Sequence, residues 1–94
     1  MNIIIRFIPP LNKMTEKKEI VLIMNSVKLT LIQVLEKIAN THPKAHSIIC
    51  TSENKINPGI ICVLNNELVI ASELESKYLN NNDEIVFSIA IAGG

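Results

Sequence analysis

The residues of this 94-residue chain whose types best suit chemistry are the last two, Gly93 and Gly94. They follow an alternation of isoleucine and alanine over residues 89–92 that is typical of a strand. Glycine has no side chain and leaves the backbone permissive, so Gly94 would carry a carboxylate on a narrow stem that a buried active site can admit. The alternative is a frayed end without function, because terminal residues are ordinarily poorly ordered.

Two histidines and two cysteines are the other candidates for chemistry. His42 and His46 have the spacing that brings two ligands together on a helix, but Pro43 between them argues against a helix, and a solvated loop is expected there. No third ligand of suitable spacing accompanies them, so no metal site is expected. Cys62 lies in an apolar run and is expected in the core. Nothing near Cys50 in the sequence predicts a lowered thiol pKa.

The composition excludes several classes of protein. Nine basic and nine acidic residues cancel, and there is no basic stripe of the kind that nucleic-acid binders carry. No apolar run approaches the roughly 18 residues of a membrane span. The first residues resemble a strand rather than a signal peptide, and two isolated cysteines make no disulfide framework. A single domain over residues 1–94, located in the cytoplasm, is therefore expected.

Apolar patterns predict a sheet with five strands. The expected strands are residues 2–8, 19–24, 60–64, 67–71 and 84–91. The first and last of them are apolar on both faces, which favours central positions. Asn65-Asn66 and residues 80–83 are expected to form turns, because Asn tolerates positive φ.

One main helix is predicted over residues 31–41. Thr30 and Gln33 fit a capping box, and Leu29 with Val34 fits a hydrophobic staple. Pro43 should end the helix near residues 40–42. Residues 44–58 are expected to form a solvated loop, residues 72–79 a single helical turn. One helix covers one face of a sheet, so the expected fold is α+β, a mixed sheet packed on one main helix. Within the loop, the residues expected to reach the core are Ile48, Ile49 and Ile56.

In this order the segments resemble the ubiquitin-like sulfur carriers, a β-grasp family that includes the molybdopterin synthase small subunit (MoaD) and the thiamine-pathway carrier ThiS. The resemblance covers the whole chain and depends on the order of its parts. It implies a ubiquitin-like β-grasp domain that ends in a flexible Gly-Gly tail of about residues 90–94. The matching parts are Arg6-Phe7 with Leu11 behind it, the helix and its exit over residues 30–43, the hairpin over residues 62–69, the approach to the last strand over residues 79–87, and Ala92-Gly93-Gly94.

The chain departs from the family pattern in a few places. Asn66 and Asn82 stand where the family usually has glycine, which asparagine can replace because it also visits positive φ. Ser88 stands where many members carry a second aromatic residue that helps to meet the partner enzyme, and Ile89-Ala90 replaces a common Pro-Pro. The long segment over residues 44–58 favours MoaD over ThiS.

The resemblance implies a chemistry for the tail. A partner enzyme activates the carboxylate of Gly94 with ATP as an acyl-adenylate, and a sulfur donor displaces AMP and leaves a thiocarboxylate. Ala92 and Gly93 supply the narrow stem. The implied partners are an adenylyltransferase of the MoeB or ThiF type, which uses the ATP, and the MoaE-type large subunit of molybdopterin synthase. The chain itself is expected to bind no cofactor and not to be catalytic alone.

A partner patch is expected on the sheet face opposite the helix. Arg6, Phe7 and Phe87 are the candidates to lie in or beside it. For both phenylalanines, ordinary packing in the core is an alternative of equal weight. For Arg6, the alternative is a solvated surface residue that contacts no partner.

Two other functions remain open at the level of the sequence. One is a ubiquitin-like modifier joined through Gly94 to lysines of other proteins, or a carrier that serves tRNA thiolation or thiamine synthesis. The other is a β-grasp interaction module in which the Gly-Gly is incidental.

Overall fold

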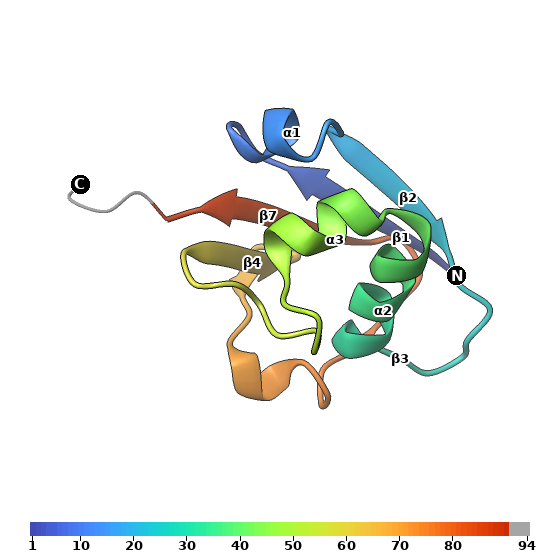
Figure 1. Ribbon diagram of the computed structural model, residues 1–94. Coiled ribbons are helices and arrows are strands. Elements are labelled where there is room, and N and C mark those ends of the chain that lie inside the picture. Colours follow the sequence, from blue (N-terminus) through green and yellow to red (C-terminus); the bar gives the residue numbers. More distant parts are fainter. Residues whose placement is uncertain (91–94) are drawn as a thin grey trace.

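A mixed five-stranded sheet forms the centre of the molecule, in the strand order β2-β1-β7-β4-β5 (Figure 1). The computed structural model describes residues 1–90, and residues 91–94 lie outside the described part. β1 and β7 run parallel, and the other neighbouring pairs are antiparallel. The strands are β1 (Asn2–Phe7), β2 (Glu19–Ile23), β4 (Ile60–Leu64), β5 (Glu67–Leu68) and β7 (Asp83–Ile89).

The two strands nearest the chain ends occupy the centre of the sheet, as predicted from their apolar faces. Ile5 pairs with Ile85 and Phe7 with Phe87 across the parallel ladder. All four side chains point to the same face and are almost fully buried. Each large side chain buried in this way contributes about 1.5–3 kcal/mol, so this central pair of strands carries much of the core.

Helices lie over one face of the sheet (Figure 1). The main helix, α2 (Leu31–Thr41), begins and ends as predicted, and its buried stripe includes Leu31, Val34, Leu35 and Ile38. The Gln33 Oε1 atom accepts a hydrogen bond from the Thr30 N–H at 2.9 Å. This bond satisfies one of the amide groups that a helix start leaves unpaired.

A second helix, α3 (Pro43–Ile49), corrects the prediction of a loop over residues 44–58. Pro43 does end α2, and His42 before it has left the helical region, with φ of −138° and ψ of 67°, because proline disfavours the helical conformation in the residue before it. The same proline is the first residue of α3, where its missing N–H costs nothing. The expectation that Ile49 reaches the core is confirmed, and Ile48 and Ile56 pack against the core as partly buried residues.

The remaining connections differ from the predictions mainly in length. The predicted strand over residues 67–71 pairs only as β5, and the predicted helical turn is the 3₁₀ turn η1 (Ala71–Glu73). An unpredicted two-stranded sheet joins β3 (Leu29–Thr30) to β6 (Tyr78–Leu79). The short helix α1 (Leu11–Met14) lies between β1 and β2. Among the helices of residues 1–90, none is long and apolar enough to cross a membrane.

Both predicted asparagine turns are confirmed. Asn65 and Asn66 connect β4 to β5 with φ of 47° and 70°, and Asn82 precedes β7 with φ of 67°. These values lie in the left-handed region that glycine and asparagine tolerate best. Asparagine therefore fills the two positions at which the resembling family usually has glycine.

Candidate functional site

The point at which the tail leaves the sheet is fixed by hydrogen bonds on both sides of β7. On the β4 side, the Ala90 N–H donates to the Gly59 carbonyl oxygen at 2.8 Å. On the β1 side, the Ile8 N–H donates to the Phe87 carbonyl oxygen at 3.0 Å. The chain is thus anchored through residue 90. The three tail residues predicted to act, Ala92, Gly93 and Gly94, lie outside the described residues.

The sheet face opposite α2 and α3, here called the open face, carries a band of partly exposed apolar side chains. Cross-strand pairing sets Val63 beside both Leu68 and Val86, and sets Ile61 beside Ser88. Leu68 is 62% exposed, and Ile8, next to the tail exit, is 44% exposed. The open face is defined by the residues Ile4, Arg6, Ile8, Glu19, Val21, Ile23, Ile61, Val63, Leu68, Glu84, Val86 and Ser88.

Arg6 lies on the open face between two carboxylates. Its Nε atom is 3.5 Å from Glu19 Oε1, and its Nη2 atom is 3.6 Å from Glu84 Oε2. About half of the Arg6 side chain is exposed. Exposed ion pairs of this kind contribute about 0–1 kcal/mol to stability. The guanidinium is therefore a charged group of the surface rather than a support of the core.

Phe7 and Phe87 lie on the other side of the sheet, in the core. Phe7 is 3% and Phe87 0% exposed, and their rings stack with centroids 6.0 Å apart. The alternative of core packing therefore describes both phenylalanines, and only Arg6 of the three predicted patch residues is on the surface. The sequence held a signal for this division, because side chains alternate along a strand and the charged Arg6 marks its own face as the one toward water.

The two cysteines carry no thiolate. Burial raises the pKa of Cys50 to about 12, and burial together with the nearby Cys50 raises the pKa of Cys62 to about 12. Both thiols are therefore protonated at neutral pH, and a protonated thiol is a poor nucleophile. The expectation that Cys62 packs in the core is confirmed by its 2% exposure.

The two histidines make separate hydrogen bonds. His46 is 8% exposed, and its Nε2 atom is 2.6 Å from Asn54 Oδ1. The expectation of a solvated loop is wrong for His46, because α3 turns this ring inward. His42 lies 2.9 Å from the Thr41 hydroxyl, through its Nδ1 atom. Among residues 1–90 the structure has no group of three or more ligating side chains that would hold a metal ion.

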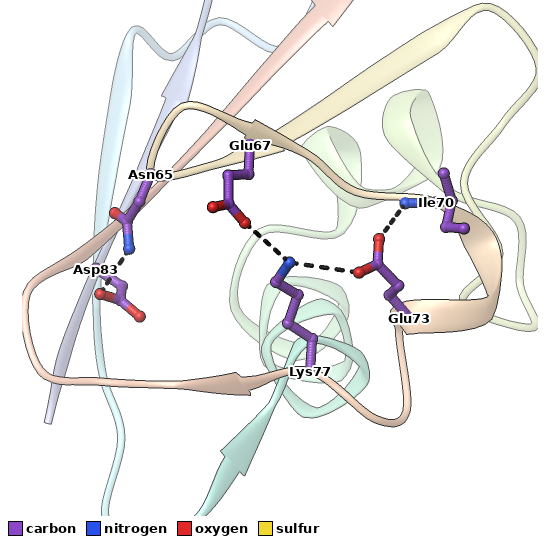
Figure 2. Close-up of polar contacts among 6 residues, drawn as sticks. All are labelled: Asn65, Glu67, Ile70, Glu73, Lys77 and Asp83. Carbon is purple, nitrogen blue, oxygen red and sulfur yellow. Dashed lines mark hydrogen bonds and ion pairs between the residues drawn. The ribbon is translucent and has the colours of Figure 1, made fainter.

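A polar brace joins the segments that follow the Asn65-Asn66 turn (Figure 2). Lys77 Nζ is 3.3 Å from Glu73 Oε2 and 3.4 Å from Glu67 Oε2, and the Ile70 N–H donates to Glu73 Oε1 at 3.0 Å. The brace ties β5 to η1 at the edge of the sheet. The brace was not predicted, although the sequence carries a signal for it, since the spacing of Glu73 and Lys77 is that of a helical ion pair.

Comparison with known proteins finds one matching family and several solved structures with a similar fold. The model of the Urm1 (Ubiquitin related modifier) family matches residues 2–94. No match to a curated protein is found. Among solved structures, SAMP1 from Haloferax volcanii has a TM-score of 0.78 at 15% identity, with all of both chains covered.

Two further structures extend the likeness. A putative molybdopterin converting factor subunit 1 from Pyrococcus furiosus has a TM-score of 0.70 at 11% identity and covers 97% of this chain and 99% of its own. The Amycolatopsis orientalis BexX/CysO complex has a TM-score of 0.68 at 18% identity and covers 98% and 99%. At these identities the likeness shows the fold alone, and it confirms the predicted α+β, ubiquitin-like β-grasp. The matched family model, which spans nearly the whole chain, shows more: the protein belongs to the Urm1 (Ubiquitin related modifier) family.

Proposed function

We propose that the protein is a cytoplasmic sulfur carrier whose working group is the carboxylate of Gly94. The observation that carries this proposal is the anchoring of the chain through Ala90, beside a partly exposed apolar sheet face. The domain holds the start of the tail in a fixed place and offers a surface for docking next to it. Family membership supports the same role.

The proposed chemistry takes place in two steps on a partner enzyme. The Gly94 carboxylate attacks the α-phosphorus of ATP, which forms an acyl-adenylate and releases pyrophosphate. A sulfide sulfur then adds to the acyl carbon and AMP leaves, so that a thiocarboxylate remains. The carrier itself contributes position, since its two thiols stay protonated.

The length of the tail limits where the partner can place its active site. Four residues follow Ala90, and an extended chain spans at most about 3.3–3.6 Å per residue. The carboxylate therefore lies within about 14 Å of the anchored residue. A partner must dock around the tail exit to satisfy this limit. The surface side chains next to the exit are Ile8, Ile61 and Ser88, with Arg6 and Val86 one row further along the sheet.

Two classes of acceptor are candidates to receive the sulfur, and a separate observation favours each of them. The end-to-end resemblance to MoaD favours molybdenum cofactor biosynthesis, with a MoeB- or ThiF-type adenylyltransferase and a MoaE-type large subunit as partners. The match to the ubiquitin related modifier family favours the second candidate, in which the activated tail serves tRNA thiolation or is joined to lysines of other proteins. The thiocarboxylate is common to both.

The test is the intact mass of the chain after incubation with ATP, a sulfide source and an adenylating enzyme of this family. We expect a mass gain equal to sulfur replacing one oxygen, and no gain for a chain that lacks Gly94. A variant with the bulky substitution Gly94→Trp should also fail, while its unfolding curve matches that of the parent. Normal thiocarboxylate yield from either variant contradicts the proposal.

The acceptor is then decided with the thiocarboxylated chain itself. Loss of the sulfur to a pterin precursor, in the presence of a molybdopterin synthase large subunit, supports the first candidate. Adducts in which Gly94 is linked to a lysine, or sulfur transfer to tRNA, support the second. A chain that yields its sulfur to none of these acceptors leaves neither candidate standing.

A further inference from the structure

The hydrogen bonds between β1 and β2 alternate, and the alternation leaves one set of β2 backbone groups without a partner in the sheet. The Met24 N–H donates to the Met1 carbonyl at 2.8 Å, the Met1 ammonium donates to the Met24 carbonyl at 2.8 Å, and the Phe7 N–H donates to the Lys18 carbonyl at 2.9 Å. In an antiparallel pair, every second residue bonds across the ladder. Ile20 and Leu22 therefore bond to β1, and Glu19, Val21 and Ile23 point their N–H and C=O groups outward.

The outward groups form a free edge, since β2 is the outermost strand of the sheet (Figure 1). Within residues 1–90, no hydrogen bond from another segment reaches the backbone of Glu19, Val21 or Ile23. Their side chains are on the surface as well, with Val21 56% and Ile23 69% exposed. Natural sheets usually guard such an edge with a proline, a bulge or a central charge. The run Ile20-Val21-Leu22-Ile23 has none of these.

The opposite edge of the sheet is built differently. β5 is only two residues long, and the Lys77 brace ties it to the following turn (Figure 2). A short edge strand offers few backbone groups to another chain. The contrast makes the β2 edge the one suited to binding another strand.

Positive charge gathers at one end of the free edge. Lys17 and Lys18 directly precede β2, and Lys13 lies on α1 just before them; all three are exposed. None of them forms an ion pair with a carboxylate of residues 1–90, whereas the neighbouring Glu16 and Glu19 are paired with Lys44 and Arg6. The net charge next to the start of β2 is therefore positive and available to an acidic partner.

We propose that the β2 edge binds an extended acidic segment of another protein by strand addition. The segment pairs antiparallel with β2 and bonds to the outward N–H and C=O groups of Glu19, Val21 and Ile23. Its alternate apolar side chains extend the open face next to Val21 and Ile23. Acidic residues at its C-terminal end face Lys17 and Lys18. This site is separate from the tail chemistry and does not depend on it.

A second copy of the chain suits the β2 edge less well than an acidic segment does. Two β2 strands paired about Val21 would set Lys18 opposite Met24 and Lys17 opposite Asn25. Neither residue is acidic, so the lysines would stay uncompensated. An acidic segment supplies both the backbone groups and the missing charge.

The test uses the isotopically labelled chain and a synthetic peptide of sequence Val-Thr-Val-Thr-Val-Asp-Glu-Asp. We expect the amide signals of Glu19, Val21 and Ile23 to shift and their hydrogen exchange to slow by about tenfold, a change that reports new hydrogen bonds. The Ile20 and Leu22 amides, already bonded to β1, should keep their exchange rates. Absence of shifts, or shifts without this alternation, overturns the proposal.

Variants separate backbone pairing from charge. Val21→Pro removes one outward N–H at a position where an edge strand tolerates proline, and it should weaken peptide binding by at least about tenfold. Val21→Thr keeps the N–H and serves as the matched control. The double variant Lys17→Glu/Lys18→Glu should weaken binding by about tenfold, whereas Lys37→Glu on α2 should leave it unchanged.

Two further outcomes decide the nature of the occupant. A peptide in which lysines replace the three acidic residues should bind at least about tenfold more weakly. Equal binding contradicts the role of Lys17 and Lys18. If sedimentation shows that the free chain dimerises, and Val21→Pro abolishes the dimer, the edge belongs to a second copy and the proposal is wrong.

Discussion

Phe7 and Phe87 lie opposite each other on the two parallel central strands, with ring planes 20° apart and ring centroids 6.0 Å apart. They are the last buried side chains on either strand before the tail exit, and Ile89 beyond them packs against the core as a partly buried residue. The next residues, Ile8 and Ser88, belong to the open face. The stacked pair therefore lies on the core side of the sheet, directly behind the part of the open face on which the proposed partner docks.

Removing one ring of this pair should destabilise the fold strongly. Phe87→Ala leaves a cavity in the core and should lower the free energy of unfolding by about 3–5 kcal/mol. Ser88→Ala, one residue along on the open face, should change it by no more than about 0.5 kcal/mol. Urea unfolding followed by circular dichroism measures both. Similar losses for the two variants would show that Phe87 does not pack as described.

The cysteines should be inert while the chain is folded. Raising the thiol pKa from 9.0 to about 12 lowers the thiolate fraction at pH 8 by roughly a thousandfold. Iodoacetamide should therefore leave Cys50 and Cys62 unmodified in the native chain and alkylate both in denaturant, as read by intact mass.

The same residues provide a test of where the sulfur is carried. A folded Cys50→Ala/Cys62→Ala variant should form the thiocarboxylate in the yield of the parent, because the proposed chemistry uses only the tail. Loss of the mass gain in this variant, with its fold intact, would assign the sulfur to a cysteine instead.

The brace at Glu73 should make stability depend on pH in the acidic range. The hydrogen bond from the Ile70 N–H, and then the Lys77 ammonium, lower the pKa of Glu73 below its ordinary value of 4.5. A carboxyl whose pKa is lower in the folded state stabilises the fold fully above its unfolded value and loses that contribution as the pH falls through the folded value. The contribution should thus be present at pH 7 and fade below about pH 4.5.

A variant comparison isolates this effect. Glu73→Gln should lower the Tm at pH 7 and lower it less at pH 3, where the parent has lost the same contribution. Glu75→Gln is the matched control, because Glu75 makes no side-chain hydrogen bond or ion pair within residues 1–90. An equal Tm difference at both pH values would contradict the role given to the Glu73 carboxylate.

The left-handed turn residue Asn82 should accept glycine but not alanine. Its φ of 67° costs an ordinary L-residue roughly 1–2 kcal/mol, a cost that glycine does not have. Asn82→Ala should therefore lower the free energy of unfolding by about 1 kcal/mol or more, and Asn82→Gly should change it by only a few tenths. Calorimetry on the two variants decides this, and the reverse order would contradict the turn geometry.

The sheet was largely predictable because its two central strands are apolar on both faces. That same property hid which face the helices cover, and with it the position of Phe7 and Phe87. A strand buried on one side and partly covered on the other has no clear alternation. Only the charge of Arg6 shows which face of β1 is turned toward water. Because side chains alternate along a strand, the neighbouring Phe7 then belongs to the face that packs in the core.

Helix α3 could not be predicted from Pro43 alone, since proline both ends one helix and begins the next. The signals that distinguish these roles are the residues after it. Ala45 and Ile49 are buried four positions apart, which is a helical spacing. Of the predicted site, the surface position of Arg6 could be predicted from its charge, and the role of the tail stays a prediction because Ala92, Gly93 and Gly94 lie outside the described residues. The β2 edge could not be predicted, because a sequence does not show which residues of a strand direct their backbone hydrogen bonds outward.

The parallel pairing of β7 with β1 also determines how the domain bears a mechanical load. A pull on the chain beyond Ala90, directed along β7, acts parallel to the strand and loads the ladders to β1 and β4 together, in shear. Many hydrogen bonds then resist at once, instead of opening one after another as they would in peeling. Under the proposed function, an enzyme that pulls on the tail would therefore act against a domain that resists unfolding, and the domain would stay folded from one sulfur transfer to the next.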